Sequence, residues 1–227
     1  MSHPLTDEQA AVVDAVRAGQ NAAVSAYAGA GKTHTLVAAA AELPERRCIF
    51  TAFNAKIIED SSRKFGPNTL CRTTHSLATG VAHSQGGWRW ARMKAPRVVG
   101  RPLAQMLGIN DPITVNADLV LHPSRLASIA VLMIDRFAVS GDDEISWWHL
   151  PQINRVDSPS DRKMLGQALV PAARRAWADA TNERGRLPYT HNYYRKEWAL
   201  THPRIDADLI MVDEAQDCQP PGTAVLM

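Results

Sequence analysis

The sequence predicts an α/β fold: a parallel sheet with flanking helices, interrupted by a mostly helical insertion. Two observations lead to this prediction. Short apolar runs alternate with helical patterns in residues 1–84 and again near residue 210, whereas the part between them shows helical patterns without a convincing strand. Alternating strands and helices are typical of a parallel sheet, because each parallel connection needs a crossover. A chain of 227 residues, 45% of them hydrophobic, is long enough for such a domain with an insertion.

The first elements are a capped helix, a strand and an alanine-rich helix. Thr6 is a suitable N-cap, apolar residues then recur at helical spacing, and Gly19 ends the pattern. Asn21 to Ala26 is a run of small residues that we expect to form a short buried strand. Lys32 to Ala41 is predicted as a helix that is closed by Pro44.

Two further strand and helix pairs follow. Arg47 to Thr51 is an apolar strand candidate, and Asn54 to Phe65 is predicted as the helix after it. A third strand is expected at Thr69 to Arg72, with a helix that begins at His75. This succession indicates neighbouring parallel strands.

The rhythm then changes from about residue 85 to about residue 201. Helical patterns are found at Ser124 to Phe137, Asp161 to Arg184 and His191 to Leu200. The alternation returns with an apolar strand at Ala207 to Val212. We therefore expect residues 1–84 and 186–227 to form one α/β domain and residues 85–185 to form a helical insertion.

Other features narrow the class of protein. The three cysteines are widely spaced and form no C-x-x-C pair, which argues against a disulfide framework and against a zinc site. A protein of a reducing compartment fits this pattern. The amino terminus shows no signal pattern, and the longest apolar run is too short to span a bilayer. We expect no membrane partner and a cytoplasmic protein, associated with the nucleoid, or a nuclear one in a eukaryote.

The stretch SAYAGAGKT, residues 25–33, indicates a phosphate-binding loop. The common pattern has glycine where this chain has Ala26, but close approach of the backbone depends mostly on Gly29 and Gly31. A strand, a glycine-rich turn and a helix opening with Lys-Thr form the expected context, with backbone N–H groups and the helix dipole facing phosphates. The alternative is a flexible glycine-rich turn with a solvated lysine. The candidate nucleotide-binding residues are Ala28, Gly29, Ala30, Gly31, Lys32, Thr33 and His34.

A second motif, VDEAQD at residues 212–217, supplies the acids that nucleotide hydrolysis needs. Lys32 is expected to contact the β- and γ-phosphates of ATP, while Thr33 and Asp213 are expected to hold Mg²⁺. Glu214 is the candidate general base. The alternative is that these acids only cap the turn that follows the strand.

The two motifs, together with LTDEQ at residues 5–9, resemble those of the UvrD/Rep type of superfamily 1 DNA helicases, and most of all those of the F-box DNA helicase group. The resemblance implies a RecA-like P-loop NTPase domain that uses ATP and Mg²⁺ and binds single-stranded DNA or DNA junctions. Further similar stretches are TAFNAKIIEDSSRKF (residues 51–65), CRTTHSLA (71–78), RFAVSGDDEI (136–145), YTHNYYRKEW (189–198) and VDEAQDC (212–218).

The resemblance also implies roles for two glutamines. Gln9 would read the adenine base, and Gln216 would sense the γ-phosphate and link hydrolysis to DNA. The spacing of Thr6 and Gln9 also fits a capping box, in which Gln9 only bonds back to the Thr6 N–H.

The same resemblance places five residues in loops that face single-stranded DNA. Polar and aromatic side chains at strand ends bond phosphates and stack on bases. His75 fits equally well as a histidine at the start of a helix. The five are Phe53, Asn54, Thr73, Thr74 and His75.

An independent indication of nucleic-acid binding is a stretch without acids, from residue 61 to residue 110. In it, Trp88 and Trp90 alternate with Arg89, Arg92 and Lys94, as on a surface that stacks on bases and attracts phosphates. These residues make the insertion, residues 85–185, a candidate for DNA contacts. The alternative is that the tryptophans are the buried anchor of the insertion and that the arginines are solvated.

Helicases of this type use two RecA-like domains, and the second one is expected to be absent here. We therefore expect weak hydrolysis by the chain alone, and unwinding only with a second polypeptide that carries the missing C-terminal motor domain. Two other functions stay open: a DNA-binding or inhibitory module with a non-hydrolysing nucleotide site, and a P-loop ATPase or kinase unrelated to DNA.

Overall fold

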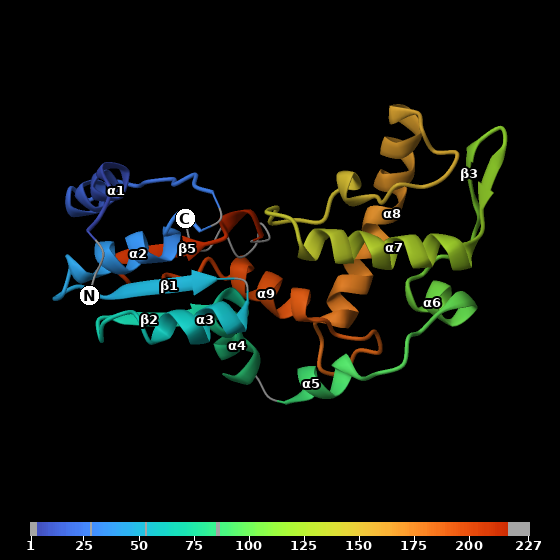
Figure 1. Ribbon diagram of the computed structural model, residues 1–227. Coiled ribbons are helices and arrows are strands. Elements are labelled where there is room, and N and C mark those ends of the chain that lie inside the picture. The colour runs from blue at the N-terminus through green and yellow to red at the C-terminus, as the bar shows by residue number, and fades with distance from the viewer. Residues whose placement is uncertain (1–3, 28, 53, 85–86, 218–227) are drawn as a thin grey trace. The chain divides into compact units, whose positions relative to one another are not determined.

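The computed structural model describes residues 4–27, 29–52, 54–84 and 87–217, and Figure 1 shows the elements along the chain. The described residues divide into two compact units. Unit 1 takes residues 4–77 and 204–217, and unit 2 takes residues 78–203. The insertion therefore starts earlier and ends later than the expected boundaries at residues 84 and 185. The difference arises largely because helix α9 (His191–Leu200) packs against helix α7 (Pro123–Ala138) of unit 2.

In the described part of unit 1, three parallel strands form a sheet in the order β2-β1-β5. They are β1 (Cys48–Ala52), β2 (Thr69–Thr73) and β5 (Leu209–Asp213). The central strand β1 pairs with both neighbours, and Ala52 lies opposite Thr73 on one side and Asp213 on the other. The three strands confirm the expected positions near residues 47–51, 69–72 and 207–212.

Four helices accompany this sheet: α1 (Asp7–Arg17), α2 (Lys32–Ala41), α3 (Ala55–Ser62) and the beginning of α4 (Thr74–Ser84). The core is centred on Phe50 of β1, which is fully buried. Its ring lies 4.7 Å from that of Phe65, and apolar residues of α2 and α3 pack on the same cluster. Burial of one such side chain stabilises the fold by about 1.5–3 kcal/mol.

The expected strand at Asn21 to Ala26 is wrong. In the structure this segment has no regular secondary structure, and its side chains are exposed. Alanine, asparagine and serine carry little apolar surface, so burial of this segment yields little free energy to offset the cost of ordering it. Among the described residues, β5 is therefore an edge strand of the sheet.

Unit 2 is mostly helical, but it contains a hairpin that the sequence analysis missed. Strands β3 (Ile113–Asn116) and β4 (Leu119–Leu121) pair in antiparallel fashion, with an irregular register between Thr114 and Asn116. The helices of this unit, besides the rest of α4, are α5 (Trp88–Met93), α6 (Gly100–Met106), α7, α8 (Pro159–Ala180) and α9, with a short 3-10 turn η1 (Trp147–His149).

Helices α7 and α8 supply most of the core of unit 2. On α7 the buried residues recur every three or four positions from Leu126 to Ala138, which is the spacing of one helix face. Phe137 closes this face, and its ring contacts Trp177 of α8 edge-on at 5.2 Å. The helix α9 begins and ends at the residues expected from the sequence.

Two general expectations can be compared with the described residues. Cys48 and Cys71 carry free thiols, while Cys218 lies outside the described part of the chain. Within that part, no helix combines the length and the apolar character needed to cross a membrane.

Candidate functional site

The glycine-rich turn leads directly into helix α2. Gly29 and Gly31 have φ angles of 79° and 82°, a left-handed conformation that L side chains rarely adopt. Gly31 is the N-cap of α2, and among the described residues no side chain caps this end. The N–H groups and the positive end of the helix dipole therefore remain available at α2. Ala28 lies outside the described residues.

The carboxyl end of β5 meets the start of α2 through a hydroxyl and a carboxylate. The Thr33 hydroxyl donates to Asp213 Oδ2 at 3.2 Å, although the two residues are 180 positions apart. Asp213 is buried, and its other oxygen accepts from the N–H of Glu214 at 3.0 Å. The structure thus brings together the two residues expected to hold Mg²⁺.

The second acid meets the lysine of the turn. Lys32 Nζ lies 3.5 Å from Glu214 Oε1, and the Gln216 amide donates to the other Glu214 oxygen. The Gln216 amide and then the Lys32 ammonium lower the pKa of Glu214 below its ordinary value. Glu214 has a φ of 51°, a left-handed conformation that is uncommon for a residue with a side chain. The candidate catalytic residues Lys32, Glu214 and Gln216 therefore form one contiguous group.

Gln9 forms the capping box and a further contact. Its Oε1 accepts from the Thr6 N–H at 3.1 Å, and the Thr6 hydroxyl accepts from the Gln9 N–H at 3.4 Å. The capping alternative is therefore confirmed. Its Nε2 also donates to the Ala30 carbonyl at 3.2 Å, a bond that sequence reasoning missed because no local pattern links residues 21 positions apart. The adenine role of Gln9 remains a prediction, and His34 is exposed on the first turn of α2.

The residues expected to face DNA at the end of β1 are partly described. Phe53 lies outside the described residues. Asn54 is the N-cap of α3, and its side chain accepts from the Lys56 N–H at 2.9 Å. The sequence analysis did not anticipate this capping bond. The DNA role of Asn54 remains a prediction.

The residues expected to face DNA at the end of β2 lie where this strand leads into helix α4. The Thr73 hydroxyl accepts from the Ser76 N–H at 3.0 Å, and Thr74 is buried. His75 is the second residue of α4 and is partly exposed, as the helix-start alternative requires. Strands β1 and β2 are parallel neighbours, so these residues and Asn54 lie at the same edge of the sheet.

The prediction that Arg89 forms a DNA-binding surface is wrong. Its guanidinium is buried in unit 2, where Nη2 pairs with Glu197 Oε1 at 3.0 Å and Nε donates to the Tyr189 hydroxyl at 3.2 Å. It also lies 4.4 Å from the centre of the Trp88 ring. A buried charge needs partners such as Glu197 and Tyr189, and these two lie about a hundred residues away in the sequence.

The prediction is also wrong for Arg92, which is buried and holds the loop after α8. It donates to the carbonyl of Asp179 at 3.2 Å and to those of Asn182 and Leu187. Of the three cations, Lys94 alone is exposed. The alternative of buried tryptophans and solvated arginines does not describe this segment either, because Trp88 and Trp90 are half-buried while the two arginines are buried.

Unit 1 is thus an α/β domain with a candidate phosphate-binding site at the carboxyl end of a parallel sheet. The chain is 29% identical over 231 residues to F-box DNA helicase protein 1 of Schizosaccharomyces pombe, an alignment that covers 95% of this chain and 25% of that protein. It is 28% identical over 233 residues to F-box DNA helicase 1 of Gallus gallus, covering 95% of this chain and 21% of that protein. The comparisons confirm the resemblance to F-box DNA helicases that the motifs indicated.

The chain spans about a quarter of the length of these relatives. No family model matches the sequence, and no solved structure matches it. The relation to DNA helicases is therefore one of sequence similarity.

Proposed function

We propose that unit 1 is a RecA-like, ATP-binding part of a DNA helicase or translocase. The observation that carries this proposal is the meeting of Lys32 and Thr33, at the start of α2, with Asp213 and Glu214, at the end of β5. A lysine, a hydroxyl and two acids beside a glycine-rich turn are the groups that phosphoryl transfer from a nucleotide requires. The relatives named DNA helicases support the same reading.

The residues present fit ATP and Mg²⁺. The left-handed conformation of Gly29 and Gly31 lets the backbone of the turn approach a phosphate closely. The space beside Gly29 is open, because a Cβ built there would meet no described atom within 4 Å. Thr33 and Asp213 offer hard oxygen ligands, and Mg²⁺ commonly takes one or two carboxylates together with waters and phosphate oxygens. Within the described residues, no group of three or more histidine, cysteine, aspartate and glutamate side chains is placed to hold a metal ion.

Each residue of the group has a distinct task in this proposal. Lys32 would exchange its contact with Glu214 for the β- and γ-phosphates, and the bound Mg²⁺ would neutralise charge that develops during transfer. Glu214, released from Lys32, would become a stronger base and accept a proton from the attacking water. Gln216, already bonded to Glu214, would hold that carboxylate in position.

We propose further that single-stranded DNA or a DNA junction binds at the edge of the sheet formed by Asn54, Thr73 and His75. Polar groups at the ends of neighbouring strands bind backbone phosphates without reading the sequence. Coupling of hydrolysis to unwinding would require a second motor domain, since translocation needs two grips on DNA that alternate.

Calorimetric titration with Mg-ATP tests the nucleotide site. Lys32→Ala should abolish binding, because the turn loses its cation, whereas Glu214→Gln should keep binding and lose hydrolysis. Lys64→Ala, which removes an exposed lysine of the same unit, is the matched control and should leave both unchanged. Unchanged ATP affinity in Lys32→Ala would refute the site.

Measurements of ATP hydrolysis and of DNA binding with the same parent chain and variants distinguish the remaining functions. Stimulation of ATP hydrolysis by single-stranded DNA supports the helicase reading. DNA binding without nucleotide binding would indicate a DNA-binding or inhibitory module, and hydrolysis that ignores DNA would indicate an unrelated ATPase.

A further inference from the structure

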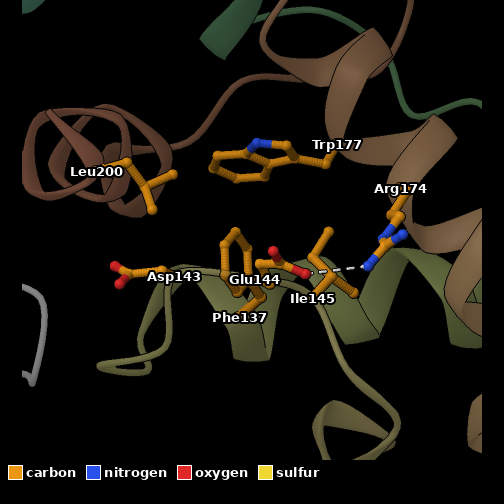
Figure 2. Close-up of a pocket in the computed structure, with 7 residues that line it drawn as sticks. All are labelled: Phe137, Asp143, Glu144, Ile145, Arg174, Trp177 and Leu200. Atoms are coloured by element: carbon orange, nitrogen blue, oxygen red, sulfur yellow. Dashed lines mark hydrogen bonds and ion pairs between the residues drawn. The ribbon is translucent and has the colours of Figure 1, made fainter.

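Unit 2 contains a pocket of about 280 Å³ that none of the functional assignments above uses (Figure 2). Its inner wall is apolar and aromatic, and the Trp177 indole of α8 lies opposite Phe137 and Ile145. Its remaining residues are charged or lie at the end of α9. The full lining consists of Phe137, Asp143, Glu144, Ile145, Arg174, Trp177 and Leu200.

The loop that carries the acids of this pocket is held by a buried lysine. Lys196 of α9 is 2% exposed, and its Nζ donates to the Ser140 carbonyl at 3.1 Å and to the Asp142 carbonyl. It also lies 4.2 Å from the centre of the Phe137 ring. Because burial of an ammonium is costly, two carbonyl acceptors and an aromatic face are needed to hold it there.

A buried histidine fixes the same loop from the other side. His149 is 3% exposed, and its Nε2 lies 2.9 Å from Asp142 Oδ2 and 3.1 Å from the Ser140 hydroxyl. The Trp148 indole N–H donates to the same Asp142 oxygen at 3.0 Å. Asp142 is thus held by His149 and Trp148, whereas the next two acids, Asp143 and Glu144, are exposed.

The two outward acids differ in their partners. Glu144 pairs with Arg174 at 3.2 Å, as the dashed line in Figure 2 shows. The Asp143 side chain is 68% exposed, and its Oδ1 lies 3.9 Å from His202 Nε2. Among the described residues, Asp143 forms no ion pair with an arginine or a lysine, although the buried Lys196 ammonium is near enough to attract it electrostatically. Its exposed carboxylate can therefore accept a further cation at the mouth of the pocket.

We propose that this pocket is a docking site for a partner protein and takes one arginine side chain from a basic segment of it. Phe137 and Tyr193 already contact the Trp177 ring, at 5.2 and 5.3 Å between ring centres, so the guanidinium would lie against the part of this half-buried indole that they leave exposed. There it would pair with Asp143, since arginine combines contact with an aromatic ring and bidentate bonding to a carboxylate. The methylene stem would contact Ile145 and Leu200. The lining has two carboxylates and one arginine, Arg174, so its net charge favours a cation and disfavours the phosphates of a nucleic-acid backbone.

The size of the pocket supports a single side chain as the occupant. At about 280 Å³ it lies just below the range of about 300–1,000 Å³ that holds drug-sized ligands. An isolated arginine is therefore a weak ligand, and a whole partner would add contacts around it. Buried arginine and tryptophan contacts of this kind commonly dominate the affinity of an interface.

The experiment uses the full chain, labelled with ¹⁵N, and the tryptophan indole N–H signals in NMR spectra. The probe is a capped tripeptide of arginine between two leucines, and the control probe replaces the arginine by citrulline, which keeps the shape and removes the charge. The Trp177 signal is assigned by its loss in Trp177→Phe. We expect the arginine peptide to shift the Trp177 signal, with a dissociation constant on the order of 1 mM.

Two variants locate the binding. Asp143→Asn keeps the size of an exposed side chain and should weaken the arginine peptide by about two- to fivefold, the range of an exposed ion pair. Asp157→Asn is the matched control: it removes an equal charge before the start of α8, about 22 Å along the helix from Arg174, and should change nothing.

The proposal is overturned if citrulline and arginine peptides shift the Trp177 signal equally, because the charge would then be irrelevant. It is also overturned if Asp143→Asn and Asp157→Asn bind the arginine peptide alike. A shift of the Trp177 signal by single-stranded DNA that Asp143→Asn enhances would assign the pocket to nucleic acid instead.

Discussion

Two glycines of the turn before α2 share one backbone conformation but have different surroundings. The φ angles of Gly29 and Gly31 differ by only 3°, from 79° to 82°. A Cβ at Gly29 would meet no described atom within 4 Å, whereas a Cβ at Gly31 would lie 2.8 Å from Gln9 Nε2. The substitutions Gly29→Ala and Gly31→Ala therefore impose the same backbone strain, and the second also displaces Gln9.

The magnitudes follow from these two effects. A left-handed alanine costs about 1–2 kcal/mol, and the reduced entropy of the unfolded chain offsets about 0.4–1 kcal/mol. We expect Gly29→Ala to destabilise unit 1 by about 0.5–1 kcal/mol in net terms. Gly31→Ala should cost about 0.5–1.5 kcal/mol more, because Gln9 loses its bond to the Ala30 carbonyl. In a Gln9→Ala background the two substitutions should cost the same.

Hydrogen exchange of individual segments, followed by mass spectrometry, is the suitable assay. All six tryptophans lie between residues 88 and 198, so their fluorescence reports on unit 2 and serves as an internal control. Protection of α2 and of β5 reports the opening free energy of unit 1. Fluorescence-detected unfolding of unit 2 should stay unchanged in Gly29→Ala and Gly31→Ala, with and without Gln9→Ala, and in Gln9→Ala itself.

Two results would contradict this reasoning. If Gly29→Ala and Gly31→Ala lower the protection of α2 equally, Gln9 does not lie against the turn. If Gln9→Ala leaves the difference between them intact, the extra cost at Gly31 has another source.

Three further predictions address single residues. Arg92→Met should destabilise unit 2 by about 3–5 kcal/mol in fluorescence-detected denaturation, because buried carbonyl acceptors lose their donor. The control Lys94→Ala should change the stability by less than about 0.5 kcal/mol. Thr51→Val should stabilise unit 1 by about 1 kcal/mol or more in hydrogen exchange, because the Thr51 hydroxyl is fully buried without a partner among the described residues; increased exchange of β1 would be the opposite outcome. Lys32→Ala should move the pKa of Glu214 upward in a carboxyl ¹³C titration, since the Lys32 ammonium is one of the groups that lower it, and an unmoved titration would show that the ion pair does not form in solution.

The elements that sequence reasoning predicted well are those whose pattern is local. Helix α9 has its expected bounds, and α2 begins and ends at Lys32 and Ala41 as expected, because amphipathic spacing and caps are properties of neighbouring residues. The hairpin of β3 and β4 also had a local signal. Ile113 to Val115 and Leu119 to Leu121 are short, largely apolar runs with several β-branched residues around a turn, and the expectation of a mostly helical insertion overrode them.

The elements that it predicted badly depend on distant partners. Arginines in a stretch without acids indicated a surface for phosphates, yet the acceptors of Arg89 and Arg92 come from residues 179–197. Asn21 to Ala26 was expected as a strand because strands usually precede such a turn. A strand also needs a ladder and apolar burial, which this segment does not find among the described residues.

The candidate site itself depends on the register of a strand that returns after the whole of unit 2. Asp208 fixes this return, because its carboxylate accepts from the Arg47 N–H at 2.9 Å and its own N–H donates to the Arg47 carbonyl at 2.8 Å. From there β5 runs in register along β1, so that Asp213 lies opposite Ala52. A slip of one residue would turn Asp213 to the other face of the sheet and away from Thr33. The bonds between Arg47 and Asp208 lie at the opposite end of the strand from the site, yet they set the alignment that lets Thr33 and Asp213 meet across 180 residues.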